Sequence, residues 1–346
     1  MATASLVFLI PKGPASVTSG GYLTQQRLLA ALRAVETIEV VEYEHRAIES
    51  LATLPPFDSS TLFFAGWGPD AERLQRALTP RPFVYWANSV GWKIRLPSRT
   101  AIVCGSRFTL GYWGEIAPDA PLYYLPNPIE NEFTNRGLDR DIDVLVQARK
   151  TSSYLSESLL PRLRQLGLRV EVLAESVPDM AELFNRTRVY LYDSRDFWLE
   201  RGVSEGFGLP PLEAMACGCA VFSSVNGGVS DYLDPPFRGF KIGNYAVEYD
   251  VTRVARAASQ EPIDVDDFIR PYRPQAVAER WRSIATELRE FFMMTREAPG
   301  SVSHRILEGP RIYTTGQLSR PTLRARSIRA LSRIRRRSVR VRTPGR

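Results

Sequence analysis

The chain has 346 residues, of which 44% are hydrophobic and 24% charged, the composition of an ordinary globular protein with room for two domains. Its longest apolar run, Leu6 to Ile10, is far shorter than the roughly 20 residues of a membrane span. The N-terminus also lacks the basic region and long apolar core of a signal peptide, so we expect a cytoplasmic protein.

The formal net charge of +7 is concentrated at one end of the chain. Residues 320–346 contain eleven arginines and no acidic residue, and subtracting these eleven charges leaves −4 for residues 1–319. A mildly acidic body argues against a nucleic-acid partner. The segment Arg320–Arg346 has two interpretations: a disordered basic tail, or an amphipathic helix that contacts an anionic membrane surface from the inner face.

Short apolar runs alternate with helical patterns in the first half, which predicts α/β units around a parallel sheet. An amphipathic helix is expected over about Leu23–Val35. The expected strands are Ser5–Ile10, Glu39–Tyr43, Thr61–Ala65, Phe83–Trp86, Ala101–Cys104 and Leu122–Leu125.

A polar loop ending in Ser19-Gly20-Gly21 lies between the first strand and the first helix. Glycines between a strand and a helix N-terminus are typical of an anion site, although the spacing is not that of a dinucleotide fingerprint. Two interpretations stay open: a structural turn, or a loop that contacts phosphate or acceptor.

The second half repeats the pattern, with a second doubly wound parallel sheet expected. Its expected strands are Asp143–Gln147, Val170–Leu173, Val189–Tyr192 and Ala220–Phe222. Helices are expected over about Tyr154–Leu166 and Gln275–Phe292.

The most informative stretch runs from Ser204 to Asp231. It contains Glu205 and Glu213 with a Gly-Phe-Gly turn between them, followed by two prolines suited to a first helical turn. The expected helix runs from about Pro211, with Glu213 in its first turn, and stops at Gly218 in a left-handed cap.

This stretch, E-G-F-G-L-P-P-L-E-A-M-A-C-G-C-A-V followed by G-G-V-S-D-Y-L, resembles the signature of family 4 glycosyltransferases, which are retaining and use nucleotide sugars. The resemblance implies the GT-B fold, in which two Rossmann-like parallel-sheet domains face a central cleft. It also implies that Glu213 holds the donor ribose and that Glu205 lies near the donor sugar. The donor-binding set then also includes Gly206, Phe207, Gly208 and Leu209.

A carboxylate has two acceptor oxygens and can bind a vicinal diol, so the residue types fit these roles. The alternative from the residues alone is that Glu213 only complements the helix dipole and Glu205 is a solvated loop acid.

Arg149 and Lys150 follow the first strand of the second half and precede three hydroxyl residues, 151–153. Such a loop is suited to a diphosphate. In the family that the chain resembles, an arginine and a lysine of this loop neutralise the leaving group; they are usually about five residues apart, whereas here they are adjacent. The alternative is a solvated charge pair.

Many members of that family carry a histidine facing the donor sugar in the segment that corresponds to residues 84–89. Here the only histidines are His45 and His304, so Asn88 or Ser89 is expected to replace it, and Asn88 is our second catalytic candidate beside Glu205. The nearby Tyr85, Trp86 and Trp92 are expected either to stack on a sugar or to pack in the core.

The segment Leu125–Ile129 resembles the family's crossover between domains. We therefore expect an acceptor-side domain over 1–128, a donor-side domain over 129–274, a returning helix over 275–295, and a basic tail over 296–346. Two D-x-D sequences, at 141–143 and 264–266, spell a metal motif of another glycosyltransferase fold, but the first is at the wrong end of a strand and the second is in a linker-like run. We expect no metal and no cofactor.

The predicted function is transfer of a sugar, with retention and without metal, from a nucleoside-diphosphate sugar to a glycan or lipid-linked hydroxyl. Two alternatives remain: a catalytically silent GT-B scaffold that binds a nucleotide or glycan, and a nucleotide-sugar epimerase on the same fold.

Overall fold

The computed structural model describes residues 4–12, 20–92, 94–97, 100–175, 177–243, 246–297 and 306–308. Residues 1–310 form one compact unit. Ser19 and the basic segment 320–346 lie outside the described residues.

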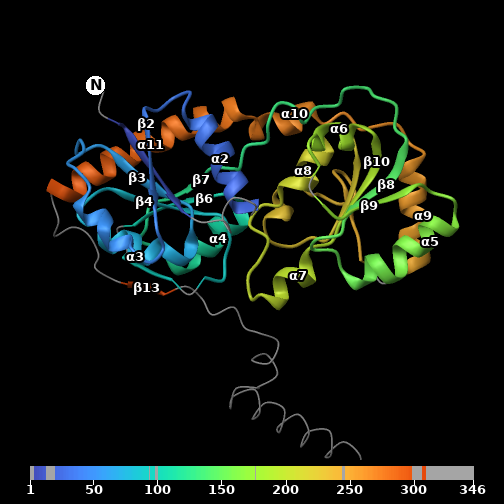
Figure 1. Cartoon of the computed structure of the whole chain (residues 1–346), viewed down its shortest axis with the longest axis horizontal. Coiled ribbons are helices and arrows are strands. Elements are labelled where there is room, and N and C mark those ends of the chain that lie inside the picture. Colours follow the sequence, from blue (N-terminus) through green and yellow to red (C-terminus); the bar gives the residue numbers. More distant parts are fainter. Residues whose placement is uncertain are drawn as a thin grey trace, which may run out of the picture. The chain divides into compact units, whose positions relative to one another are not determined.

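The first sheet is parallel throughout and has the order β2-β1-β3-β4-β6-β7 (Figure 1). Leu6 of β1, the strand next to the edge strand β2, pairs with Ile38 on one side and with Leu62 on the other. The strands are β1 (Leu6–Pro11), β2 (Ile38–Tyr43), β3 (Leu62–Ala65), β4 (Phe83–Ala87), β6 (Ala101–Cys104) and β7 (Leu122–Tyr124). A separate antiparallel pair joins β5 (Arg95–Pro97) to β13 (Ile306–Glu308).

Helices cover both faces of the first sheet. Alternate residues of β1 point to opposite faces, so Leu6 and Phe8 pack under α2 and α11, and Val7 and Leu9 under α3 and α4. These helices are α2 (Gly20–Leu32), α3 (Ala71–Leu78), α4 (Arg107–Ile116) and α11 (Pro274–Glu297), with short 3₁₀ turns η1 (Ile48–Thr53) and η2 (Gly68–Asp70).

The second sheet is also parallel, in the order β12-β11-β10-β8-β9. Val144 of β8 pairs with Val189 of β10 and with Val170 of β9. The strands are β8 (Ile142–Gln147), β9 (Val170–Leu173), β10 (Thr187–Tyr192), β11 (Ala220–Ser223) and β12 (Phe240–Lys241).

Helices α6 and α8 pack on one face of this sheet, and η3, α5 and α9 on the other. The elements are η3, a π-helix (Tyr154–Leu159), α5 (Leu160–Gln165), α6 (Met180–Asn185), α7 (Arg195–Glu200), α8 (Leu209–Ala216), η4 (Gly227–Asp231), α9 (Val247–Ala258), α10 (Asp266–Ile269) and η5 (Arg270–Tyr272). The two parallel sheets with helices on both faces confirm the predicted α/β, doubly wound architecture.

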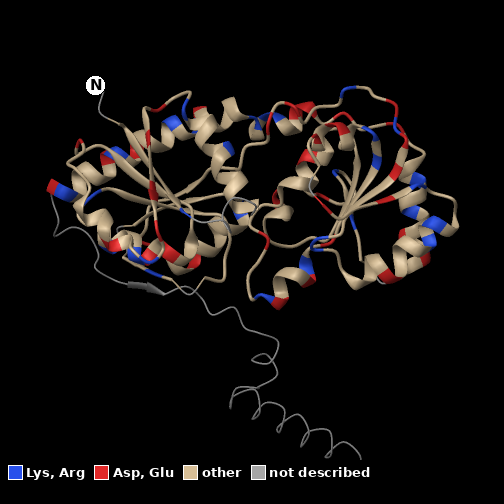
Figure 2. Ribbon diagram, viewed as in Figure 1, with Lys and Arg blue, Asp and Glu red and all other residues tan. Residues whose placement is uncertain are grey.

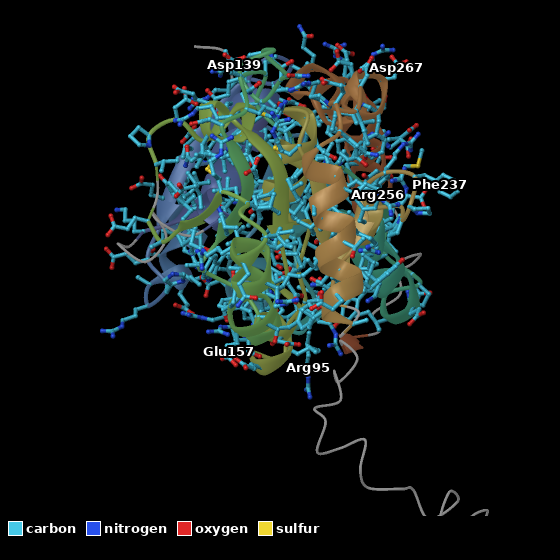
Figure 3. The ribbon with its side chains drawn as sticks, turned by 90° about the vertical axis from the view of Figure 1, so that its right-hand side faces the viewer. Arg95, Asp139, Glu157, Phe237, Arg256 and Asp267 are labelled. Atoms are coloured by element: carbon cyan, nitrogen blue, oxygen red, sulfur yellow. The ribbon has the colours of Figure 1, made fainter. Side chains whose placement is uncertain are left out.

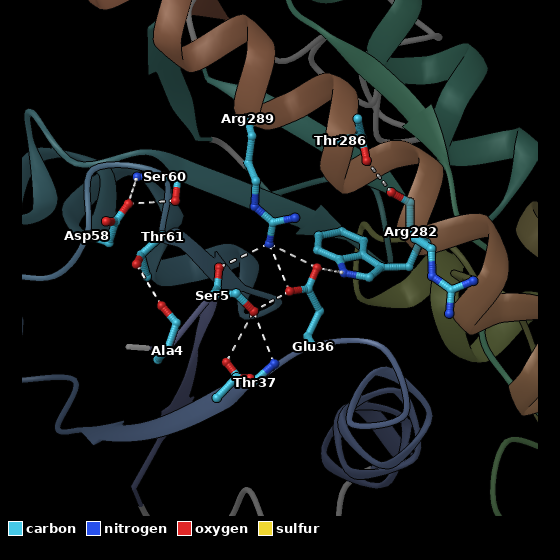
Figure 4. A network of polar contacts seen from close by, with 11 residues as sticks. Ala4, Ser5, Glu36, Thr37, Asp58, Ser60, Thr61, Arg282, Thr286 and Arg289 are labelled. Atoms are coloured by element: carbon cyan, nitrogen blue, oxygen red, sulfur yellow. Dashed lines mark hydrogen bonds and ion pairs between the residues drawn. The ribbon is translucent and has the colours of Figure 1, made fainter. Parts of the chain in front are cut away.

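The long helix α11 packs against the first sheet although it follows the second in sequence. Trp281 and Leu288 are buried with residues of β1 and α2. Glu36, after α2, accepts hydrogen bonds from the Trp281 indole at 3.0 Å and from Arg289 at 2.8 Å, and its carboxylate also contacts Ser5 (Figure 4). The domain limits predicted at 128, 274 and 295 stay a prediction; the first sheet ends at Tyr124 and the second begins at Ile142.

Three predicted helices differ from the structure. The first begins at Gly20 and ends at Leu32, so Gly20 and Gly21 form its first turn and not a loop before it. The helix expected over 154–166 starts as a π-helix. The signature helix starts at Leu209, which places Glu213 beyond the first turn, while Gly218 has the predicted left-handed conformation with φ of 83°.

Acidic and basic residues are interspersed along the helices of the described part (Figure 2). Within the described ranges, no helix combines the length and the hydropathy needed to cross a membrane.

Candidate functional site

Glu205 is held at the carboxyl ends of β8 and β10, where ligands bind in parallel α/β sheets. Its side chain is 8% exposed, which rules out the solvated loop acid. One oxygen, Oε2, accepts hydrogen bonds from the Tyr192 hydroxyl and from the Trp198 indole N–H, the latter at 2.6 Å, and lies 3.4 Å from Nζ of Lys150. Within the described residues the other oxygen, Oε1, has no hydrogen-bond partner.

Lys150 lies between this carboxylate and an aromatic face. Its Nζ is 4.3 Å from the centre of the Trp198 ring, a cation–π contact. Burial lowers the pKa of Lys150, and the Glu205 carboxylate offsets this in part. Its φ of 68° is the single positive value at a non-glycine position in the described chain, a strained conformation of the kind that clusters at functional sites.

Glu213 lies in the second turn of α8 and is 4% exposed. Its Oε1 forms an ion pair with Arg27 of α2, whose Nε also lies 3.0 Å from Glu130. Burial raises the pKa of Glu213, and the Arg27 guanidinium lowers it only in part. Because Glu213 lies beyond the first turn and has a specific cation, the helix-dipole interpretation is wrong.

Two glycines of the signature stretch lie so close to other backbone atoms that there is no room for a side chain. A Cβ at Gly206 would overlap the carbonyl oxygen of Asn88, and one at Gly228 would overlap the oxygen of Gly206. The amide of Gly228 donates to the Glu205 carbonyl at 2.8 Å. The turn that carries Glu205 is therefore packed between η4 and the carboxyl end of β4.

Asn88 is adjacent to Gly206, so the structure brings it to the turn that carries Glu205. Its Oδ1 is buried without a hydrogen-bond partner, as is Oδ1 of Asn127. Both oxygens face the Cα of Gly105. An unsatisfied buried acceptor is costly.

Of the aromatic residues near Asn88, Tyr85 and Trp86 are fully buried and pack in the core. Trp92 is 36% exposed, and its indole N–H donates to Ser89 at 2.7 Å. Stacking on a sugar is therefore open to Trp92 and not to the other two.

The remaining predicted site residues are dispersed. Arg149 is exposed, and the Phe207 side chain is buried against Tyr232. Gly208 precedes α8 and faces the Tyr232 hydroxyl, and Leu209 starts the helix half-buried. The exposed Gly20 and Gly21 start α2, and Ser19 is outside the described residues.

Carboxylates of both D-x-D sequences have partners within the protein: ion pairs in the first sequence and a hydrogen bond within a turn in the second. Asp141 pairs with Arg186 at 2.6 Å, and Asp143 with Arg169 at 3.5 Å. Asp264 accepts a hydrogen bond from the amide of Asp266. Among the described residues, no cluster of three or more His, Cys, Asp or Glu side chains is arranged to hold a metal ion.

A cavity of about 330 Å³ lies elsewhere, at the amino end of β11, and its lining includes Val221, Phe237, Asp267 and Phe268. Phe237 and Asp267 project at the surface there (Figure 3). Because ligands of parallel sheets bind at the carboxyl ends and none of the predicted site residues lines this cavity, we place the site at Glu205.

Residues 157–270 match the family model of glycosyl transferases group 1. The chain has the GT-B fold, and this segment is similar to group 1 glycosyltransferases. The matched segment includes both glutamates and the whole of α8, so the predicted glycosyltransferase is confirmed. Among curated protein sequences, none matches this chain.

Three solved structures are similar to this GT-B chain. HepE of Anabaena, in complex with UDP and glucose, is 14% identical, with 86% of this chain and 99% of HepE covered and a TM-score of 0.51. AviGT4, a glycosyltransferase involved in avilamycin A biosynthesis, is 16% identical, with 82% and 98% covered and a TM-score of 0.54. Sucrose-phosphate synthase from Thermosynechococcus elongatus is 12% identical, with 85% and 100% covered and a TM-score of 0.54.

Sequence reasoning missed three residues of this site: Arg27, Tyr192 and Trp198. Tyr192 ends β10, a position at which side chains reach the site edge of a parallel sheet, so it had a usable signal. Arg27 and Trp198 had none. Arg27 lies on a helix whose partner the local pattern does not indicate, and Trp198 lies on α7, which was not predicted.

Proposed function

We propose that this glycosyltransferase moves a sugar, with retention and without a metal ion, from a nucleoside-diphosphate sugar to a hydroxyl of a glycan or lipid-linked acceptor. The observation that carries the proposal is the buried Glu205, held through one oxygen by Tyr192, Trp198 and Lys150. A carboxylate fixed on one side keeps the other oxygen for a substrate hydroxyl.

The donor's parts then fit distinct residues. The free oxygen of Glu205 accepts a hydrogen bond from the donor sugar, and Glu213 accepts one from the ribose. Lys150 and the positive end of the α8 dipole face the diphosphate and offset the charge that develops as it departs; of the first three residues of α8 only Leu209 has a backbone N–H, because Pro210 and Pro211 follow it. Arg149, exposed beside Lys150, adds long-range attraction for the anionic donor.

UDP-glucose is the first donor to test, because HepE has been solved in complex with it. The assay measures release of nucleoside diphosphate from common nucleotide sugars, with and without saccharide or lipid acceptors and in the presence of a metal chelator. We expect turnover by the native chain and loss of donor binding in Glu213→Ala. The exposed Glu279→Ala, on the outer surface of α11, is the matched control and should behave as native.

The outcomes separate the alternatives. Binding of a nucleotide sugar without release of nucleoside diphosphate from any donor would favour the silent scaffold. Conversion of the donor sugar without transfer would favour the epimerase, and loss of activity with the chelator would contradict metal independence.

We further propose that the arginines of residues 320–346 contact an anionic membrane surface on the cytoplasmic side. A chain shortened by these residues should lose association with vesicles containing phosphatidylserine. Association that persists in the shortened chain would refute this role.

A further inference from the structure

His45 and Asp70 form a hydrogen-bonded pair at the carboxyl edge of the first sheet. His45 follows β2, and Asp70 ends the 3₁₀ turn η2 after β3. The carboxyl ends of β2, β1, β3 and β4 are neighbours in this sheet, so the pair lies on the same edge as Asn88. Nothing in the donor site uses either residue.

The contact with Asp70 orients the imidazole ring of His45. Nδ1 of His45 contacts Oδ2 of Asp70, which also accepts a hydrogen bond from the Tyr43 hydroxyl at 3.1 Å. Burial raises the pKa of Tyr43, which keeps it protonated as a donor. In the neutral ring, a carboxylate that accepts from Nδ1–H leaves Nε2 as the unprotonated nitrogen.

Exposure differs sharply between the two members. The His45 side chain is 43% exposed, whereas that of Asp70 is 9% exposed. Among the described residues Nε2 of His45 has no hydrogen-bond partner. The partly exposed His45 ring therefore has one acceptor nitrogen without a partner in the described part of the chain, and the buried Asp70 fixes the orientation of the ring.

The indole rings of Trp67 and Trp92 lie along a chain of contacts that begins at this imidazole. The Trp67 ring centre lies 5.9 Å from that of His45, and the Trp92 indole packs on Gly68, the residue after Trp67. Trp92 bonds to Ser89, and Asn88 beside it packs on Gly206 of the signature turn. A chain of contacts thus connects His45 to the turn that carries Glu205.

Partly exposed aromatic faces beside a hydrogen-bond acceptor suit a saccharide, whose rings have apolar faces and whose edges carry hydroxyl donors. We propose that His45, positioned by Asp70, together with Trp67 and Trp92, forms an acceptor subsite for a saccharide. Nε2 of His45 accepts a hydrogen bond from an acceptor hydroxyl. This inference rests on the proposed transferase function and assigns its acceptor half.

Histidine NMR tests the subsite directly, because the chain has only two histidines, His45 and His304. Full-length protein labelled with ¹⁵N-histidine is titrated with methyl α-glucoside, methyl α-mannoside and maltotriose in the presence of UDP. We expect the His45 ring signals to shift saturably with at least one saccharide while those of His304 stay in place. The ring of His45 should be the Nδ1–H form, and Asp70→Asn should remove that preference.

Kinetics provides the second arm. His45→Phe keeps a ring beside Trp67 but removes the acceptor nitrogen, and His304→Gln is the matched control. In His45→Phe we expect transfer to the saccharide that shifts His45 to fall at least tenfold, with unchanged donor binding and acceptor-free donor hydrolysis; the control should match the native chain. Melting temperatures verify that each variant is folded.

The two arms keep this proposal separate from the one on which it rests. If the native chain turns over no nucleotide sugar, the transferase proposal fails. If it transfers normally while His45→Phe transfers equally well, or if no saccharide shifts the His45 signals, the acceptor subsite alone is overturned.

Discussion

The ion pair between Arg27 and Glu213 is the most informative contact to perturb. It joins α2 of the first sheet to α8 of the second, and the two side chains are 16% and 6% exposed. Removing one partner of a buried pair leaves an uncompensated charge, a loss of about 3–5 kcal/mol. Since Arg27 is slightly exposed, we expect the lower end, about 3 kcal/mol, for Arg27→Met at pH 8.

The reverse change should cost less. In Glu213→Gln, Arg27 keeps its contact with Glu130 at 3.0 Å, so about 1.5–2 kcal/mol is expected, the lower part of the range for a lost hydrogen bond to a charged group. The double variant should lose less stability than the sum of the two single variants, with a coupling of about 1–2 kcal/mol.

The effect of Arg27→Met should depend on pH. In the native chain, burial raises the pKa of Glu213 above its usual 4.5. The protonated carboxyl therefore stabilises the fold fully below about pH 4.5, and this contribution is lost as the pH rises through the pKa of the folded state. Without Arg27 that pKa rises further and the loss becomes larger. The variant should therefore be close to native at pH 5 and clearly less stable at pH 8.

Thermal melting of the native chain, both single variants and the double variant at pH 5 and pH 8 measures these differences. Glu279→Ala, in an exposed pair on α11, is the control and should be neutral at both pH values. Additive losses, or an Arg27→Met deficit equal at pH 5 and pH 8, would refute a buried, coupled pair.

Three further predictions concern single residues. Trp198→Phe keeps the ring beside Lys150 but removes the N–H donor to Glu205. We expect kcat for donor turnover to fall about tenfold, the effect of a lost hydrogen bond to a charged group. An unchanged kcat would show that Trp198 does not act through Glu205. The backbone at position 150 has a φ of 68°, which glycine adopts without strain. Lys150→Gly should therefore have a higher melting temperature than Lys150→Ala, and the reverse order would contradict this backbone conformation. Both variants should lose turnover. Gly206→Ala should lower the melting temperature because its Cβ overlaps Asn88, whereas Gly111→Ala, in a helix with open space around it, should raise it; equal shifts would contradict the close packing at Gly206.

The strands were predictable because strands buried on both faces of a parallel sheet appear as continuous apolar runs. The run Phe83–Trp86 is β4, which extends one residue further to Ala87. The run Ala220–Phe222 is likewise β11, which ends at Ser223. Helix α7 was not predicted because it has no fully buried residue, so the sequence shows no apolar stripe.

The site was predictable on one side only. Glu205 and Glu213 stood out because their spacing and glycines form a local pattern, but what holds each carboxylate is not local. Arg27 is 186 residues from Glu213 in sequence, and no periodicity connects them. His45 was noted only as a histidine absent from the expected segment, because its pairing with Asp70 requires β2 and β3 to end at the same sheet edge.

The two glutamates differ in which part of the chain controls them. The donors to Glu205, namely Tyr192, Trp198 and Lys150, all come from the second sheet and its loops, so the hydrogen bonds that orient its carboxylate belong to that half. Glu213 takes its cation from α2, which packs on the first sheet. A ribose hydroxyl that binds Glu213, as we propose, would share the carboxylate with Arg27 and so link nucleotide binding energetically to the contact between α2 and α8. It follows that changes at Arg27 should act mainly on donor affinity, whereas changes at Trp198 should act mainly on turnover.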